Sequence, residues 1–464
     1  MEKARTRTIF VCQQCGRESP KWLGRCPNCQ EWNSFAETLQ TPVRPAAPRA
    51  RPSGTVPQEL SKVKGETGRR IAMPIAEFNR VLGGGLVPGA LVLIGGDPGI
   101  GKSTLLLQVS GAIAASGGSV VYVSGEESVH QVKLRAQRLG ITGDRLFLLA
   151  ETSLPAILDQ LESMSPDMVI VDSIQTVYID DISSAAGSIG QIRECAAALM
   201  RWAKPANVPV LISGHVTKDG AIAGPRVLEH VVDAVLYLEG EQFSTFRILR
   251  GVKNRFGSTN EIGVFEMTEK GLKEVENPSL AFLSSHEEPA VGTAVVPTLE
   301  GSRPLLVEIQ ALTSLSVYPP PRRMANGIDL ARLLLITAVL GKRTGLKLAT
   351  QDIVVNVVGG LRVNEPAADL AVAMTIASSF REAGVLPRMA VIGELSLTGE
   401  LRGVPQLDRR VAEAARLGFE KCLVPRLHGK QSPSVSGIQV IEAGTINEAL
   451  RAGLSRPRKI ENES

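Results

Sequence analysis

Long hydrophobic runs are missing from this sequence. The longest apolar stretches, such as Leu333–Leu340, fall far short of the ~18–20 residues that an α-helix needs to span a bilayer. The opening segment, MEKARTRTIF, also lacks the apolar core of a signal peptide. We therefore expect a cytoplasmic protein without a membrane partner, in a compartment that keeps thiols reduced.

A strong overall charge is missing as well. The net charge is only +4, which by itself does not indicate nucleic-acid binding. The charge is unevenly distributed, because residues 1–70 hold 13 Lys and Arg against 6 Asp and Glu, whereas the rest of the chain holds 38 against 41. Positive charge at the amino end could contact phosphates. A solvated basic tail explains the same feature equally well.

Length and local composition predict several domains. A chain of 464 residues is too long for one core, and its 44% hydrophobic and 21% charged residues are typical of globular proteins. The predicted boundaries are 1–35 for a cysteine module, 36–70 for a basic linker rich in Pro, Ala and Arg, 71–276 for a first domain, 277–290 for a second linker, 291–455 for a second domain and 456–464 for a disordered tail.

Short apolar runs alternate with helical stretches in residues 71–276. The runs typical of buried parallel strands are Leu91–Ile94, Val120–Val123, Leu146–Leu149, Met168–Val171 and Val208–Ile212. Helical periodicity between them predicts a doubly wound α/β domain. Residues 291–455 combine strand patterns such as Ile353–Val357 with two long helical patterns.

The cysteines form a cluster near the amino end. Two C-x-x-C turns can bring four thiolates to one tetrahedral ion, so we predict a closed, structural zinc site. Its ligands would be Cys12, Cys15, Cys26 and Cys29. Redox-active dithiols or an iron–sulfur cluster are the alternatives. Trp22, Trp32 and Phe35 are expected to form the small core of this module, while Cys195 and Cys422 stand alone and are expected to be buried apolar residues.

A phosphate-binding motif, G-x-x-x-x-G-K-[ST], lies between an apolar strand and a helical stretch. This context predicts that its backbone N–H groups surround the phosphates of a nucleotide. Lys102 is expected to contact the β- and γ-phosphates, and Ser103 to bind Mg²⁺. The full set of expected nucleotide contacts in the motif is Gly96, Asp97, Pro98, Gly99, Ile100, Gly101, Lys102, Ser103 and Thr104.

Carboxylates follow two other strands of the predicted sheet. Asp172 ends the strand Met168–Val171, where the Mg²⁺ shell of a P-loop protein needs a carboxylate, although a helix N-cap is the competing interpretation. Glu126 and Glu127 follow Val120–Val123, and either could activate water for ATP hydrolysis. We favour Glu126, with solvent-exposed carboxylates at a helix start as the alternative.

With these residues in place, the sequence resembles the bacterial RadA family of DNA-repair proteins, also called Sms. The resemblance covers the four-cysteine finger, a RecA-like P-loop ATPase core and a C-terminal Lon-protease-like α+β domain. It implies that Glu126 is the catalytic glutamate and that His215 lies where relatives carry a γ-phosphate sensor. It also identifies residues 253–257, KNRFG, as a family motif. Lys253 and Arg255 of this motif could act as catalytic cations at a neighbouring subunit's nucleotide, whereas a basic hairpin turn is the simpler interpretation.

The Lon-like segment departs from its family pattern. Ala367 stands where the resemblance places the nucleophilic serine, and Asp408 stands where it places the catalytic lysine. A Ser–Lys dyad needs both side chains, so no peptidase activity is expected. The family resemblance implies a DNA-stimulated, helicase-like ATPase that forms a hexameric ring, binds single-stranded and branched DNA, and promotes branch migration with the RecA recombinase. An ATP-dependent Lon-type protease and a non-enzymatic, nucleotide-gated scaffold are the alternatives.

Overall fold

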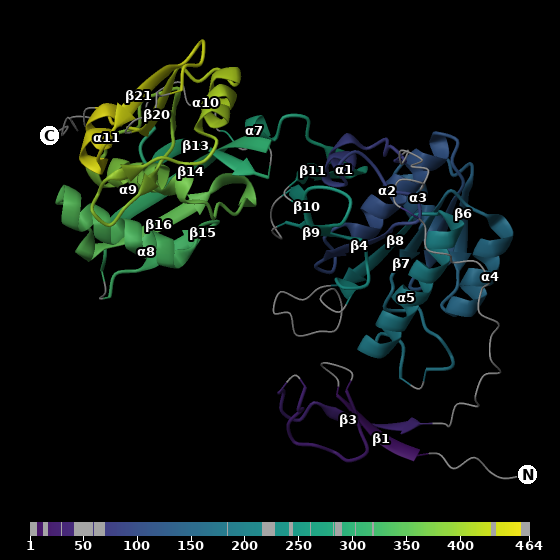
Figure 1. The fold of residues 1–464 in the computed structure, drawn as a ribbon. Coiled ribbons are helices and arrows are strands. Elements are labelled where there is room, and N and C mark those ends of the chain that lie inside the picture. Colours follow the sequence, from purple (N-terminus) through teal and green to yellow (C-terminus); the bar gives the residue numbers. More distant parts are fainter. Residues whose placement is uncertain are drawn as a thin grey trace, which may run out of the picture. The chain divides into compact units, whose positions relative to one another are not determined.

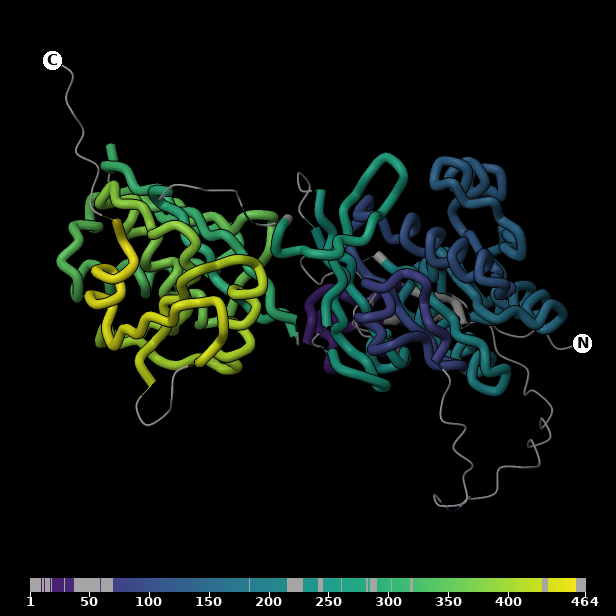
Figure 2. Tube along the Cα trace, turned by 90° about the horizontal axis from the view of Figure 1, so that it is seen from above, coloured from purple at the N-terminus to yellow at the C-terminus, as the bar shows by residue number. Residues whose placement is uncertain are grey.

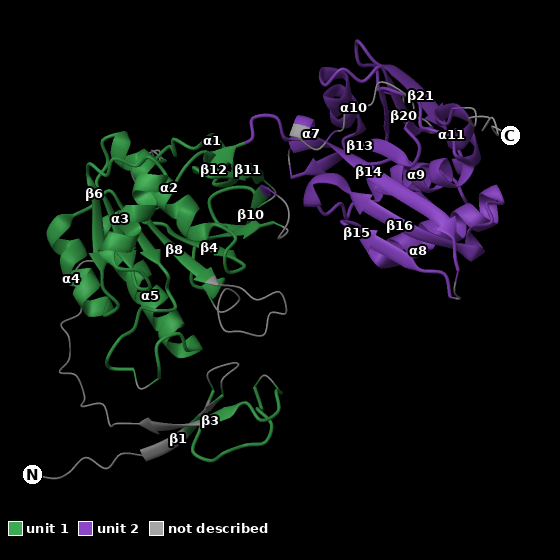
Figure 3. Ribbon diagram, turned by 180° about the vertical axis from the view of Figure 1, so that it is seen from behind, with its two compact units in different colours: residues 1–240, 247–274 green, residues 241–246, 275–464 purple. Residues whose placement is uncertain are grey.

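A computed structural model describes residues 7–12, 17–28, 30–40, 59, 70–182, 184–215, 228–240, 245–259, 261–281, 283, 290–301, 303–317, 320–427 and 433–455. The chain divides into two compact units, residues 1–240 with 247–274 and residues 241–246 with 275–464 (Figure 3). Among the described residues, no helix is both long enough and apolar enough to cross a bilayer. The predicted tail, 456–464, lies outside the described residues.

The amino-terminal module is a small sheet of three strands in the order β2-β1-β3. Its strands are β1 (Arg7–Cys12), β2 (Glu18–Ser19) and β3 (Phe35–Gln40). Strand β3 therefore extends the module beyond the predicted boundary at residue 35. Cys12, Cys26 and Phe35 form its buried core. The prediction that Trp22 and Trp32 belong to that core is wrong, because their exposed fractions are 52% and 66%.

A nine-stranded sheet forms the centre of the first domain, in the order β12-β11-β10-β9-β4-β8-β7-β5-β6 (Figure 1). The strands are β4 (Leu91–Gly96), β5 (Val120–Ser124), β6 (Leu146–Ala150), β7 (Met168–Asp172), β8 (Val210–His215), β9 (Ala234–Glu239), β10 (Phe246–Asn254), β11 (Ile262–Thr268) and β12 (Gly271–Glu274). Strands β9, β4, β8, β7, β5 and β6 are parallel neighbours, whereas β10 is antiparallel to β9 and β12 to β11. This arrangement confirms the predicted α/β fold.

Helices cover both faces of this sheet (Figures 1 and 2). Alternate residues of a strand point to opposite faces, so Val92 and Ile94 of β4 pack on one side while Leu91 and Leu93 pack on the other. The first side holds α1 (Ala76–Val81), α2 (Lys102–Ala115) and α3 (Val129–Arg138), and the second holds α4 (Leu154–Met164) and α5 (Ile189–Ala206).

Strand β6 differs from its prediction. The sequence predicts a buried strand, yet among the described strands β6 has a neighbour on only one side, and Phe147 is 45% exposed. An edge strand carries fewer covering elements than a central one, which explains the difference. Hydrophobicity alone does not distinguish these two positions in a sheet.

The second unit contains a seven-stranded mixed sheet in the order β15-β16-β14-β13-β17-β20-β21, and a separate ribbon of β18 with β19. The strands are β13 (Thr293–Glu300), β14 (Arg303–Leu315), β15 (Arg323–Asn326), β16 (Gln351–Val357), β17 (Met389–Val391), β18 (Glu394–Leu395), β19 (Leu401–Arg402), β20 (Lys421–Pro425) and β21 (Gln439–Ala443). The α-helices are α7 (Pro278–Ala281), α8 (Leu330–Val339), α9 (Asp369–Arg381), α10 (Leu407–Arg416) and α11 (Ile446–Gly453).

Helix α7 lies within residues 277–290, which were predicted to be a linker. Ser279 is buried, and its hydroxyl accepts a hydrogen bond of 3.0 Å from the backbone N–H of Leu306 in β14. Leu283 packs on the same hydrophobic cluster as Leu306. Part of the predicted linker is therefore a packed segment of the second unit, since Ser279 and Leu283 have partners there.

A partly buried ion pair joins three segments of the second unit. Arg410 of α10 is only 2% exposed and makes two hydrogen bonds, of 2.7 and 2.6 Å, with the carboxylate of Glu365. Its guanidinium also donates to the carbonyl of Pro297 in β13 at 2.8 Å. Glu365 in turn accepts the backbone N–H of Leu299 at 2.9 Å. These contacts fix α10 against β13.

Replacing Arg410 with Ala should destabilise the second unit by about 3–5 kcal/mol, because Glu365 would keep a partly buried, unpaired charge. Urea unfolding measures this change. Arg416→Ala is the matched control, since Arg416 pairs with Glu413 on the same helix but is 58% exposed, and it should cost less than about 1 kcal/mol. Equal effects of the two variants would contradict the structural role given to Arg410.

Candidate nucleotide site

The phosphate-binding loop connects the end of β4 to the start of α2. Gly96 and Gly101 bound this loop, with φ of +151° and +114°. A Cβ at Gly96 would lie 2.5 Å from the carbonyl oxygen of Leu238, and one at Gly101 would lie 2.7 Å from Cε of Met267. Both φ values lie in the region that favours glycine, and at Gly96 the backbone oxygen of Leu238 also excludes a Cβ. The first N–H groups of α2 face the loop and have no partner within the helix, which makes this a site for an anion.

The ammonium group of Lys102 contacts the backbone of the phosphate-binding loop. Its Nζ donates to the carbonyls of Gly96 at 2.8 Å and Asp97 at 3.0 Å, and the side chain is largely buried. Burial lowers the pKa of Lys102. The nearby carboxylates of Asp172, Asp97 and Glu126 oppose this effect only in part. The ammonium is thus held at the loop by carbonyl groups that a phosphate could replace.

Asp172 is positioned by two hydroxyl groups from neighbouring strands. Tyr122 of β5 donates to its Oδ2 at 2.5 Å, and Ser213 of β8 donates to its Oδ1 at 2.5 Å. Burial and the adjacent carboxylate raise the pKa of Tyr122 well above its usual value, so the phenol remains a donor. Both hydrogen bonds orient the carboxylate at the carboxyl end of β7, at the same edge of the sheet as the phosphate-binding loop.

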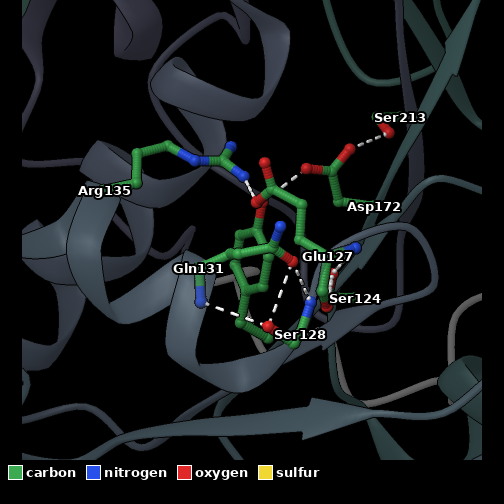
Figure 4. Close-up of polar contacts among 8 residues, drawn as sticks. Ser124, Glu127, Ser128, Gln131, Arg135, Asp172 and Ser213 are labelled. Atoms are coloured by element: carbon green, nitrogen blue, oxygen red, sulfur yellow. Dashed lines mark hydrogen bonds and ion pairs between the residues drawn. The ribbon is translucent and has the colours of Figure 1, made fainter.

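The two adjacent glutamates after β5 have different partners. Glu126 accepts a hydrogen bond of 2.6 Å from the hydroxyl of Ser173, and its carboxylate is close enough to Lys102 to influence the pKa of that ammonium. Glu127 instead pairs with Arg135, which reaches toward it from α3 (Figure 4). The backbone N–H of Glu127 also donates to the hydroxyl of Ser124 at 3.1 Å.

Several residues of this site were missed by the sequence analysis, among them Ser173, which donates to Glu126. Tyr122, Ser213 and Arg135 have the contacts just described, and Arg247 of β10 donates from Nε to the carbonyl of Ile100 at 3.2 Å. None belongs to a recognisable motif. Tyr122 and Ser213 lie in otherwise apolar strands, and a polar residue in a buried strand is the signal that could have identified them.

Lys253 and Arg255 lie at the edge of the sheet where the parallel strands begin, opposite the edge that holds the phosphate-binding loop. Lys253 donates to the carbonyls of Glu229 and Val232, and Arg255 pairs with Asp233 at 3.4 Å. Asp233 accepts the N–H of Leu91, the first residue of β4, at 3.1 Å. The phosphate-binding loop begins at the other end of β4, about 17 Å away for a six-residue strand.

This separation is longer than a lysine side chain. Neither cation can therefore contact the nucleotide site of its own chain. Burial and the charge of Arg255 lower the pKa of Lys253. The backbone of His215 ends β8 beside Gly96, and its side chain lies outside the described residues.

The cysteine module has the features of a metal-binding ribbon in its described part. Cys12 and Cys26 are buried side by side in one cluster. The backbone N–H of each donates to the carbonyl five positions later, Cys12 to Arg17 and Cys26 to Glu31, both at 2.9 Å. This repeated turn suits two converging thiolates, so these residues fit a metal ion. Cys15 and Cys29 lie outside the described residues.

The remaining predicted positions are placed as follows. Ala367 is 2% exposed and packs in the hydrophobic cluster that also holds Leu407 of α10, and Asp408 is exposed on the first turn of that helix. Cys195 and Cys422 are both buried, as expected, and burial raises the pKa of each thiol to about 12. The position at which the resemblance places a nucleophilic serine thus holds the buried methyl group of Ala367.

Three family models match successive parts of the chain. The rubredoxin metal binding domain matches residues 10–37, an AAA domain matches residues 57–221, and the model of subunit ChlI of Mg-chelatase matches residues 335–428. Together they confirm the predicted organisation as a metal-binding ribbon, a P-loop core and a C-terminal domain of the ChlI and Lon-like type.

Whole-length relatives carry one description, "DNA repair protein RadA". The relative from Listeria monocytogenes is 51% identical over 98% of this chain and 100% of its own length. The relative from Halalkalibacterium halodurans is 53% identical over 98% of this chain and 100% of its own length, and that from Bacillus subtilis is 53% identical over 97% and 99%.

Proposed function

Because this chain belongs to the family of the DNA repair protein RadA, we propose that it is a DNA-stimulated ATPase that processes recombination intermediates. The observation that carries this proposal is the convergence of the loop with Lys102, of Asp172 and of Glu126 at one edge of the parallel sheet, where Glu126 is hydrogen-bonded to Ser173, the residue after Asp172. A P-loop lysine with two carboxylates is the set of groups that ATP hydrolysis requires.

Each group has a defined part in the proposed reaction. The loop from Gly96 to Thr104 binds the phosphates through its backbone N–H groups, and Lys102 exchanges its carbonyl partners for the β- and γ-phosphates. Ser103 and Asp172 would hold Mg²⁺, which neutralises phosphate charge when bound. The hydroxyls of Tyr122 and Ser213 keep the Asp172 carboxylate oriented.

Glu126 is proposed as the general base that orients and deprotonates water. Glu127 is a poorer candidate because its charge is already paired with Arg135, and a paired carboxylate is a weaker base. Glu126 accepts a hydrogen bond from the hydroxyl of Ser173 and is close enough to Lys102 to influence the pKa of that ammonium, so its carboxylate lies on the phosphate side of the site. His215 is kept as a proposed sensor of that phosphate.

Assembly completes the proposed site. Lys253 and Arg255 lie a full strand length from their own phosphate-binding loop, so we propose that they act at the nucleotide of a neighbouring copy in a hexameric ring. Cations supplied in this way stabilise the charge that develops on the transferred phosphate. The ring is proposed to bind single-stranded and branched DNA and to promote branch migration with the RecA recombinase.

The competing functions have less support. A Lon-type protease needs a hydroxyl nucleophile and a lysine, and Ala367 with Asp408 supplies neither. A nucleotide-gated scaffold would not need a carboxylate placed close to the P-loop lysine, as Glu126 is. We also propose that the metal of the ribbon is a structural Zn²⁺ held by Cys12, Cys15, Cys26 and Cys29.

The rate of ATP hydrolysis, measured with and without single-stranded DNA, tests the proposed function. DNA should raise the rate of the parent protein severalfold, and Lys102→Ala should abolish turnover because the γ-phosphate loses its cationic partner. A rate that does not respond to DNA would favour the scaffold.

Glu126→Gln should preserve nucleotide binding and lower kcat by at least about 100-fold, because the amide cannot accept a proton. Glu127→Gln is the matched control and should retain most of the activity. Single-turnover hydrolysis together with binding of a fluorescent ATP analogue measures both quantities. Normal hydrolysis by Glu126→Gln with loss of hydrolysis in Glu127→Gln would reverse the assignment.

Metal analysis of the purified protein should find about one zinc per chain. Replacing Cys26 and Cys29 with Ser should release it and unfold the module, since such a unit depends on its metal. Iron and acid-labile sulfide in the same assay would instead indicate a cluster.

Mixing two inactive variants tests whether Lys253 acts between subunits. Lys102→Ala lacks a working P-loop, and Lys253→Ala lacks the proposed cation, yet mixed rings contain some interfaces with both groups intact. Partial recovery of ATP hydrolysis is expected. Nucleotide binding by Lys253→Ala serves as the folding control, because this residue also caps two backbone carbonyls. Subunit exchange without any recovery would assign the motif an intrasubunit or DNA-contacting role.

A further inference from the structure

Two tryptophans of the ribbon lie on its surface. Trp22 is 52% exposed and Trp32 is 66% exposed, although a buried tryptophan would contribute more to the stability of so small a module. The core is already filled by Cys12, Cys26 and Phe35. The exposure of both rings is therefore not explained by folding, which indicates a contact with another molecule.

The two indoles are neighbours with fixed positions. A Cβ at Gly24 would lie 3.7 Å from Cζ3 of Trp22 and 4.0 Å from Cζ3 of Trp32, so the rings flank the same backbone. The indole N–H of Trp22 donates to the carbonyl of Phe35 at 3.2 Å, which satisfies its polar edge. The two rings therefore lie on either side of one glycine, and more than half of each side chain is exposed.

Two cations, Arg25 and Lys21, lie next to this pair, and one acidic residue, Glu31, precedes Trp32. The Arg25 guanidinium lies over the Trp32 ring, 5.6 Å from its centroid, and is held there by two hydrogen bonds of 2.9 Å to Gln30. Lys21, next to Trp22, is exposed. Within residues 17–36 the acidic side chains are Glu18 and Glu31, and the whole segment 1–70 carries a net charge of +7.

We infer that Trp22 and Trp32 form a stacking surface for the unpaired bases of a single-stranded nucleic acid. Aromatic rings stack on any base, and adjacent cations attract the phosphates that connect the bases. A purely apolar protein partner would gain nothing from Arg25 and Lys21 at the rim, whereas a polyanion gains from both. This surface is separate from the nucleotide site, and the inference rests on the proposed action on DNA.

Tryptophan fluorescence provides a direct test, because the chain has only three tryptophans. The third, Trp202 in α5, is partly buried against the core of the ATPase domain. In a Trp202→Phe background the emission comes from Trp22 and Trp32 alone. Titration of this zinc-loaded, full-length protein with oligo(dT), without nucleotide, should quench that emission to saturation.

An abasic oligonucleotide of equal length keeps the phosphate charge but has no bases, and it should quench weakly. Quenching equal to that by oligo(dT) would overturn the inference, because charge alone would then account for the signal.

Substitutions separate stacking from apolar contact. Leucine preserves an apolar side chain but has no aromatic face, so Trp22→Leu with Trp32→Leu should weaken oligo(dT) binding by at least about tenfold, measured by anisotropy of labelled DNA. Phenylalanine at both positions should restore most of the affinity. Leu23→Ala, beside the pair, is the control and should change little.

Two outcomes distinguish this inference from the proposed function. If the double leucine variant retains its zinc, binds oligo(dT) as tightly as the parent and is still stimulated by DNA, the stacking surface is refuted while the ATPase proposal stands. If the parent itself neither binds oligo(dT) nor responds to it, the proposed function fails, and this inference fails with it.

Discussion

The parallel strands β4, β8, β7 and β5 must all end at the same edge of the first sheet, and the other features of the nucleotide site follow from this constraint. The phosphate-binding loop follows β4, Asp172 ends β7 and Glu126 follows β5. Lys102 is close enough to both carboxylates for them to influence its pKa. Segments that are far apart in sequence thereby lie together at one anion site.

The same constraint separates Lys253 and Arg255 from that site. Both belong to the end of β10, which is antiparallel to β9 and therefore finishes beside the start of β4. Asp233 joins the two there, accepting from the backbone of Leu91 and pairing with Arg255. One copy of the fold thus carries an anion site at one edge and a pair of cations at the other, which is the arrangement that repeated head-to-tail assembly can use.

Much of this architecture could be predicted from the sequence, for identifiable reasons. The P-loop could be predicted from glycines at fixed spacing, because its backbone conformation requires them. The edge of the sheet could be predicted from short apolar runs that end in carboxylates. The side chains that orient these groups were missed, since Tyr122 and Ser213 meet Asp172 only through strand order, and Arg135 meets Glu127 only through the position of α3. Trp22 and Trp32 were misassigned because composition shows that a residue is apolar but not which side of a small module it occupies. The helix at Pro278–Ala281 was missed because its partner, β14, is distant in sequence.

The central claim is that the nucleotide site of one subunit is completed by its neighbour. The most direct measurement is ATP turnover per subunit over a wide range of protein concentration, with oligomeric state followed by light scattering and nucleotide occupancy by a fluorescent analogue. The account predicts that dilution to monomers abolishes turnover while nucleotide binding persists, because each monomer keeps its own phosphate-binding loop. Full turnover by isolated monomers would contradict it.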